Sequence, residues 1–286
     1  MEIRKVPASA GAEWLLGAFL LLRKSPFGLG MLGLIYGLLA IATSLIAQVV
    51  PALALPLQFL LMLVGPLLLA GMVFAAREVD EGRSAAPHHL LRGIQDGKAG
   101  RLIGTLIPQM AALLVCVLLL VAVVGIDQLQ ALSDLMQKLQ TQANPDPAIF
   151  EGLPLGRLLL WTVLVIGVGI FTGFFTFTAL PDMMFADIGL FPAMRRSFQA
   201  CLRNLPALIV MSLLMVVVVF ALMLGITVVS LLAQLIGGQT AMMVVSNLLM
   251  TMFLAPVLTS AMYFAWKQML GGSETTTVAE PSGVAM

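Results

Sequence analysis

Long uninterrupted apolar runs constrain this chain more than any other feature of its sequence. A helix that spans a membrane needs roughly 20 predominantly apolar residues, and six runs of that length are present, at residues 27–50, 53–76, 102–124, 158–180, 205–235 and 240–265. Only 10% of the 286 residues are charged, against about a quarter in soluble proteins. The sequence therefore predicts an all-α polytopic membrane protein with six transmembrane helices in one membrane domain, residues 1–267.

The six runs pair into three hairpins, the first and last through short turns and the middle one through residues 125–157. Val50, Pro51 and Ala52 leave room only for a tight turn between the first two runs, and Gly237 with Gly238 forms the turn between the last two. Adding the surface segment that precedes each pair gives hairpin units at about 8–77, 84–180 and 190–267. The small polar residues of 268–286 predict a disordered cytoplasmic tail.

The basic residues predict the orientation of the hairpins. Thirteen of the 15 Lys and Arg residues fall on the side of the N-terminus, and only Lys138 and Arg157 fall on the other side. Basic residues collect in cytoplasmic loops. We therefore expect both termini in the cytoplasm and each hairpin to run out from the cytoplasm and back.

Amphipathic segments predict helices that lie along the membrane surface. On the cytoplasmic side, residues 8–24 carry Trp14, Leu15 and Ala18 on one face, residues 84–101 favour a short helix, and residues 190–205 have an apolar face opposite their arginines. Residues 126–141 have the same periodicity on the periplasmic side. Asp182 and Asp187 are candidate tethers for nearby arginines.

Basic residues of the two longer cytoplasmic helices are the candidate contacts with lipid headgroups. Cationic side chains at the cytoplasmic surface are attracted to anionic lipids. The predicted headgroup contacts are Arg23, Lys24, Arg195, Arg196 and Arg203.

Two short motifs recur in the first and third units. R-K-S-P at 23–26 is matched by R-N-L-P at 203–206, each before a span, and Pro66 and Pro256 each stand eight residues before a Phe-Ala pair. Because all hairpins run in the same sense, an internal repeat would be of the parallel kind. Shared topology alone is the alternative explanation for the matches.

Several segments resemble a family of uncharacterised proteobacterial inner-membrane proteins. The resemblance is carried by R-K-V-P-A at 4–8, Trp14-Leu15, the R-K-S-P junction and A-x-R-R-S-F at 193–198. In plan the chain is also similar to the membrane domain of some glycerophosphodiester phosphodiesterases, without their catalytic domain. The resemblance implies a six-span bundle in the bacterial inner membrane and brings no established activity.

Polar residues inside the spans are few and uncharged. Charged groups within a membrane are costly and mark functional sites, but none falls in the interior of a predicted span. Gln109, Asn247 and Thr251 are the candidates for an internal polar contact, with hydrogen bonding between helices as the expected role. Cys116 and Cys201 fall too far apart in the predicted topology for a disulfide.

The sequence contains no catalytic, nucleotide-binding or metal-binding motif. We therefore expect no enzyme, cofactor, metal site or nucleic-acid partner. Two kinds of function remain. One is a non-catalytic membrane protein that binds lipid or a hydrophobic small molecule, or that organises itself or other membrane proteins. The alternative is a facilitative transporter or channel for a small solute.

Overall fold

A computed structural model describes residues 3–141, 154–186 and 188–271 of the chain. These ranges hold helices and connecting segments and no strand. Five helical stretches are long and apolar enough to cross a membrane: Pro26–Val49, Pro51–Asp80, Ala99–Val124, Leu155–Phe185 and Leu205–Met269. The prediction of an all-α chain with several membrane-spanning helices is thereby confirmed.

The elements follow the apolar and amphipathic segments of the sequence. They are α1 (Ala10–Lys24), α2 (Pro26–Val49), η1 (Pro51–Leu53), α3 (Ala54–Asp80), η2 (Pro87–Leu91), α4 (Arg92–Gln95), α5 (Ala99–Ile103), α6 (Leu106–Val124), α7 (Ile126–Thr141), α8 (Leu155–Thr176), α9 (Ala179–Phe185), α10 (Leu190–Arg203) and α11 (Leu205–Met269). Pro26 begins α2 and Pro206 lies in the first turn of α11, where the missing N–H of proline costs no helical hydrogen bond.

Helix α11 contains the turn predicted at Gly237 and Gly238. Its 65 residues include one non-helical position, Gly238, with φ 69° and ψ −164°. Only glycine adopts that conformation without strain. A straight helix of this length would be about 98 Å long, about three times the thickness of a membrane core. The break lets α11 fold back as two apolar halves.

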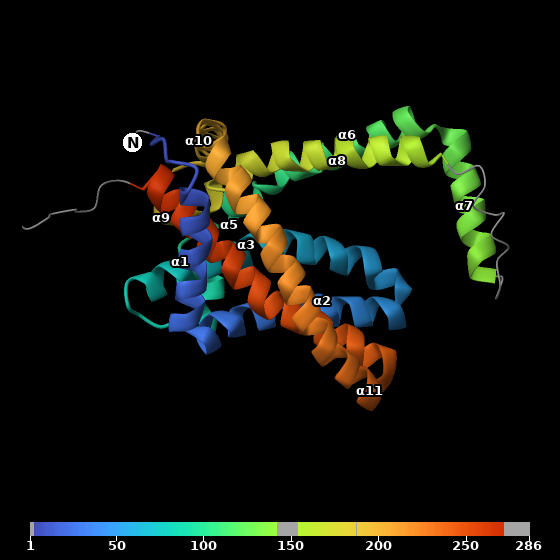
Figure 1. The fold of residues 1–286 in the computed structure, drawn as a ribbon, viewed down its shortest axis with the longest axis horizontal. Helices are drawn as coiled ribbons and strands as arrows, with labels where there is room; N and C mark the ends of the chain where they lie inside the picture. Colours follow the sequence, from blue (N-terminus) through green and yellow to red (C-terminus); the bar gives the residue numbers. More distant parts are fainter. Residues whose placement is uncertain (1–2, 142–153, 187, 272–286) are drawn as a thin grey trace, which may run out of the picture.

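The second half of α11 packs beside the α2–α3 hairpin, with glycines at the closest approach. A Cβ atom on Gly33 would lie 2.4 Å from the backbone oxygen of Thr251, and one on Gly37 would lie 2.2 Å from the Thr251 hydroxyl. The missing side chains of these two glycines therefore let α2 and α11 pack closely. The α6–α8 hairpin projects separately, with α7 at its far end (Figure 1).

Each surface segment packs against the returning helix of another predicted unit. The segment from η2 to α5 packs on α3, α10 packs on α8 and α9, and α1 packs on α11. In Figure 1, α1 and α7 lie at opposite ends of the molecule. We call the end that carries Arg23, Arg77 and Lys267 the basic end.

Protein covers the apolar face of α1, where we expected lipid. Trp14 and Ala18 are fully buried, and the Trp14 Nε1 donates a hydrogen bond to Gln268 Oε1 at 2.8 Å. The expectation is corrected because Gly11 admits the backbone of α11: a Cβ there would lie 2.0 Å from the Ala207 oxygen. Periodicity identified the buried face but not the helix that covers it.

Candidate functional site

A cavity of about 500 Å³ opens at the basic end, between α1, α3 and α11. Its volume is within the range of small-molecule sites. Arg23 and Lys24 line one part, and Asp80 lines another. The remaining lining residues are Gly17, Leu20, Leu21 and Phe264. The cavity therefore combines charged side chains with an apolar wall.

The sequence places the two cations at the end of α1. Arg23 and Lys24 occupy its last turn, where the helix dipole favours positive charge. Both are exposed, and neither makes a hydrogen bond or ion pair with any residue that the structure describes. Their charges are therefore available to a ligand.

Gly17 lets α11 form the apolar wall close to α1. A Cβ atom at Gly17 would lie 2.7 Å from the ring of Phe264. No larger residue could occupy this position without moving the ring. Glycine here sets the distance between α1 and α11 at the cavity.

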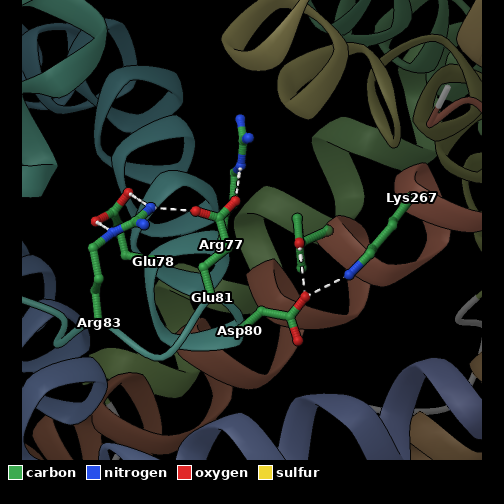
Figure 2. Close-up of polar contacts among 7 residues, drawn as sticks. Arg77, Glu78, Asp80, Glu81, Arg83 and Lys267 are labelled. Carbon is green, nitrogen blue, oxygen red and sulfur yellow. Dashed lines mark hydrogen bonds and ion pairs between the residues drawn. The ribbon is translucent and has the colours of Figure 1, made fainter. Parts of the chain in front are cut away.

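Asp80 joins the ends of α3 and α11. Its Oδ2 accepts hydrogen bonds from Lys267 Nζ at 2.6 Å and from the Tyr263 hydroxyl at 2.9 Å. Figure 2 shows the carboxylate between the two helices. The Asp80 side chain retains 19% exposure, and that of Lys267 retains 53%. Asp80 therefore holds the cavity wall together and remains partly accessible.

Other charges near Asp80 are paired among themselves. Arg77 Nε bonds Glu81 at 2.6 Å, and Arg83 bonds both Glu78 and Glu81 (Figure 2). The hydrogen bond from Arg77 is the largest cause of a lowered pKa for Glu81, and the bond to Glu78 is the largest cause of a raised pKa for Arg83. These pairs shape the turn after α3.

Arg196, predicted to contact headgroups, forms an ion pair with a buried carboxylate. Its Nη1 lies 3.2 Å from Oδ2 of Asp182, and the Asp182 side chain is fully buried. A buried carboxylate needs a paired charge, so the arginine is drawn inward. Asp182 confirms the expected tether, whereas Asp187 lies outside the described residues.

The other two basic residues predicted on α10 remain on its surface. Arg195 is exposed, and Arg203 is exposed while its Nη1 donates a hydrogen bond to the Ile3 oxygen at 2.9 Å. Cys201 on the opposite face is buried, and burial raises the pKa of its thiol to about 12. Helix α10 therefore has one exposed basic face and one buried face, but none of its residues lines the cavity.

The structure does not bring Gln109, Asn247 and Thr251 together. Gln109 is exposed on α6. The Thr251 hydroxyl donates to Asn247 O and Leu248 O of its own helix, because the helix opposite presents Gly37, which has no polar side chain. Asn247 is exposed and lines a small cavity with Ser44.

Asp80 is the charged site residue that the sequence analysis missed. It stands among three acids within residues 78–81, and no spacing or motif distinguishes it from its neighbours. Its role depends on Tyr263 and Lys267 of α11, which lie more than 180 residues further along the chain. Among the described residues, no group of three or more His, Cys, Asp or Glu could hold a metal ion.

The fold and the site define a polytopic helical membrane protein with a mixed charged and apolar cavity at one end. Comparisons with protein-family models, curated proteins and solved structures found no match. The resemblance to a proteobacterial inner-membrane family stays a prediction.

Proposed function

We propose that this protein is a non-catalytic six-span protein of the bacterial inner membrane that binds phospholipid headgroups in the cavity at its basic end. The observation that carries the proposal is a pair of cations on the wall of that cavity, Arg23 and Lys24, which have no side-chain partner among the residues that the structure describes. Arg and Lys side chains bind phosphate groups through charge-assisted hydrogen bonds.

The proposed topology counts the two halves of α11 as separate spans. Together with α2, α3, α6 and α8 they make six crossings, with both termini and the basic end in the cytoplasm. Thirteen basic residues against two support this orientation. A cysteine in place of Ser133 on α7 should then react with an impermeant maleimide from the periplasm, and one in place of Gln199 on α10 should react only after lysis.

The surroundings of the cavity favour a lipid over a soluble phosphate. Leu16, Leu20 and Phe27 are 63%, 57% and 85% exposed, respectively, close in sequence to the two cations. Apolar side chains beside a cationic site suit a ligand with a charged head and acyl chains. The proposed ligand is therefore a membrane phospholipid of the inner leaflet.

Native mass spectrometry from nanodiscs tests the proposal. A basic residue near the membrane surface contributes about 1 kcal/mol of attraction to anionic lipid, so Arg23→Gln with Lys24→Gln should weaken retention of anionic lipid roughly 30-fold. The matched control replaces Arg4 and Lys5, which are also adjacent, basic and exposed. Equal retention by both double variants would refute the proposed site.

A facilitative transporter is the second candidate function. Its support is a cavity of about 180 Å³ between α2 and the second half of α11, lined by Ser44, Gln48, Thr240 and Asn247 among others. Uptake of small polar solutes into proteoliposomes, compared between the wild type and Asn247→Leu, tests it. Solute flux that depends on Asn247 would support the transporter.

A further inference from the structure

We infer that the headgroup cavity recognises a phosphate ester that also carries hydroxyl groups, a polyol phosphate, and that Asp80 is the residue that accepts the hydroxyl hydrogen bond. The inference rests on the proposed headgroup site and specifies its ligand. Arg23 and Lys24 attract the phosphate, whereas Asp80 selects among ligands that carry one.

The two oxygens of Asp80 have different surroundings. Oδ2 accepts the bonds from Lys267 and Tyr263, whereas Oδ1 has no hydrogen bond with any residue in the described parts of the chain. Figure 2 shows the second oxygen without a contact to the residues drawn. Because Asp80 lines the cavity, a ligand there can donate a hydrogen bond to this oxygen.

The charges around the cavity decide which donor fits. Arg23, Lys24 and Lys267 bring three positive charges, and Asp80 brings one negative charge. The net positive charge favours a ligand that is anionic as a whole. An ammonium group would compete with Lys267, which already shares this carboxylate, whereas a hydroxyl donates a hydrogen bond without adding positive charge. A hydroxyl-bearing anion satisfies both conditions.

The cations and the carboxylate lie on different helices, so they can bind the phosphate and the polyol of the ligand separately. Arg23 and Lys24 come from α1, and Asp80 comes from the end of α3. A phosphate held by the α1 cations leaves the esterified polyol to face the α3 carboxylate. Charged hydrogen bonds are among the stronger polar contacts in proteins, so the carboxylate contributes selectivity.

A matched pair of lipids isolates this contact. Phosphatidylglycerol and phosphatidylmethanol carry the same phosphodiester charge, but only the first has headgroup hydroxyls. The full-length protein in nanodiscs that hold equal amounts of both should retain phosphatidylglycerol about fivefold more, given one hydrogen bond to a partly exposed carboxylate. Equal retention of the two lipids would overturn the inference while leaving the proposed headgroup site intact.

Variants of Asp80 and Tyr263 in the same nanodisc experiment test which residue is responsible for the preference. Asp80→Ala should abolish the preference for phosphatidylglycerol over phosphatidylmethanol, whatever its effect on the total amount of lipid retained. Tyr263→Phe also removes a contact of the carboxylate, but it leaves Oδ1 in place, so its preference should persist. A preference that survives in Asp80→Ala, or one lost equally in Tyr263→Phe, would contradict the role of Asp80.

Competition with soluble glycerol 3-phosphate distinguishes a lipid headgroup from a soluble polyol phosphate as the ligand. Failure of this compound to displace phosphatidylglycerol is the result expected for a lipid site. Displacement that needs both cations would keep polyol phosphate as the ligand and would contradict the proposal that the ligand is a lipid. Two results together would refute both the headgroup site and its selectivity. They are equal retention of phosphatidylglycerol and phosphatidylmethanol by the wild type, and unchanged retention of anionic lipid by the Arg23 and Lys24 double variant.

Discussion

The indole Nε1 of Trp266 donates a hydrogen bond to Oδ1 of Asp182 at 3.0 Å, although 84 residues separate the two in the sequence. Arg196 supplies the charge on the other oxygen of the same buried carboxylate. Phe185, three residues beyond Asp182, packs against Trp266 with ring centroids 4.9 Å apart. This contact joins α9, α10 and α11 at the basic end.

Loss of the buried pair should destabilise the protein strongly. Removing one partner of such a pair costs about 3–5 kcal/mol because the other charge is left uncompensated. We expect Arg196→Leu to lower the free energy of unfolding by that amount in detergent titrations with sodium dodecyl sulfate. Arg195→Leu, one residue away and exposed, is the control and should change the stability little. Similar losses in both variants would show that the Asp182 pair is not what stabilises this end.

Asn204 should hold the N-terminal segment on α11. It is 1% exposed, its Oδ1 accepts from Val6 N at 2.8 Å, and its Nδ2 donates to Arg4 O at 3.0 Å. Asn204→Ala removes both bonds, which flank Lys5, and should cost about 2 kcal/mol. Trypsin should then cleave after Lys5 several times faster than in the wild type.

Gln199→Ala on the exposed side of α10 is the control for this cleavage. If both variants are cut at the wild-type rate, the Asn204 contacts do not restrain the segment.

Substitution of alanine for two glycines in different spans should have opposite effects on stability. Gly33→Ala places a methyl group 2.4 Å from the Thr251 oxygen and should destabilise the fold by about 1–3 kcal/mol, as overpacking does. A Cβ at Gly169 of α8 meets no atom within 4 Å, so Gly169→Ala should preserve or raise the stability, since alanine favours helix. Equal effects of the two substitutions on thermal stability would contradict the packing of α2 against α11.

The thiol of Cys201 should be unreactive in the folded protein. Burial raises its pKa to about 12, so at pH 8 only about one thiol in 10,000 is the reactive thiolate. The labelling rate with maleimide should stay low at neutral pH and rise only as the pH approaches 12 or after unfolding. Gln199→Cys, in a background where Cys201 is serine, should label rapidly at pH 8. Rapid labelling of Cys201 itself at pH 8 would mean that α10 does not pack as described.

Sequence patterns predicted what depends on local residues. The length of the apolar runs and the Gly237-Gly238 pair predicted the fold-back of α11, because a span has a fixed length and glycine permits the turn. The period of α1 predicted that Trp14 faces an apolar environment. It did not predict Gln268 as its partner, because that contact joins residues 254 positions apart.

The sequence predicted only the part of the candidate site that depends on local residues. Arg23 and Lys24 were identified because basic residues beside a span have a known preference for headgroups. Asp80 and Phe264 become neighbours of those cations only through tertiary packing. Arg196 has the same local signal as Arg195, yet the buried Asp182 draws it into the protein.

Photo-crosslinking tests the central claim most directly. Phosphatidylglycerol with a diazirine on its headgroup would be activated in nanodiscs that hold the full-length protein, and the modified peptides would be mapped by mass spectrometry. We expect crosslinks on the cavity wall, at residues 17–24 and at Asp80, and their loss when Arg23 and Lys24 are both replaced by glutamine. Crosslinks that are spread over the exposed α6–α8 hairpin and absent from residues 17–24 would contradict a headgroup site in the cavity.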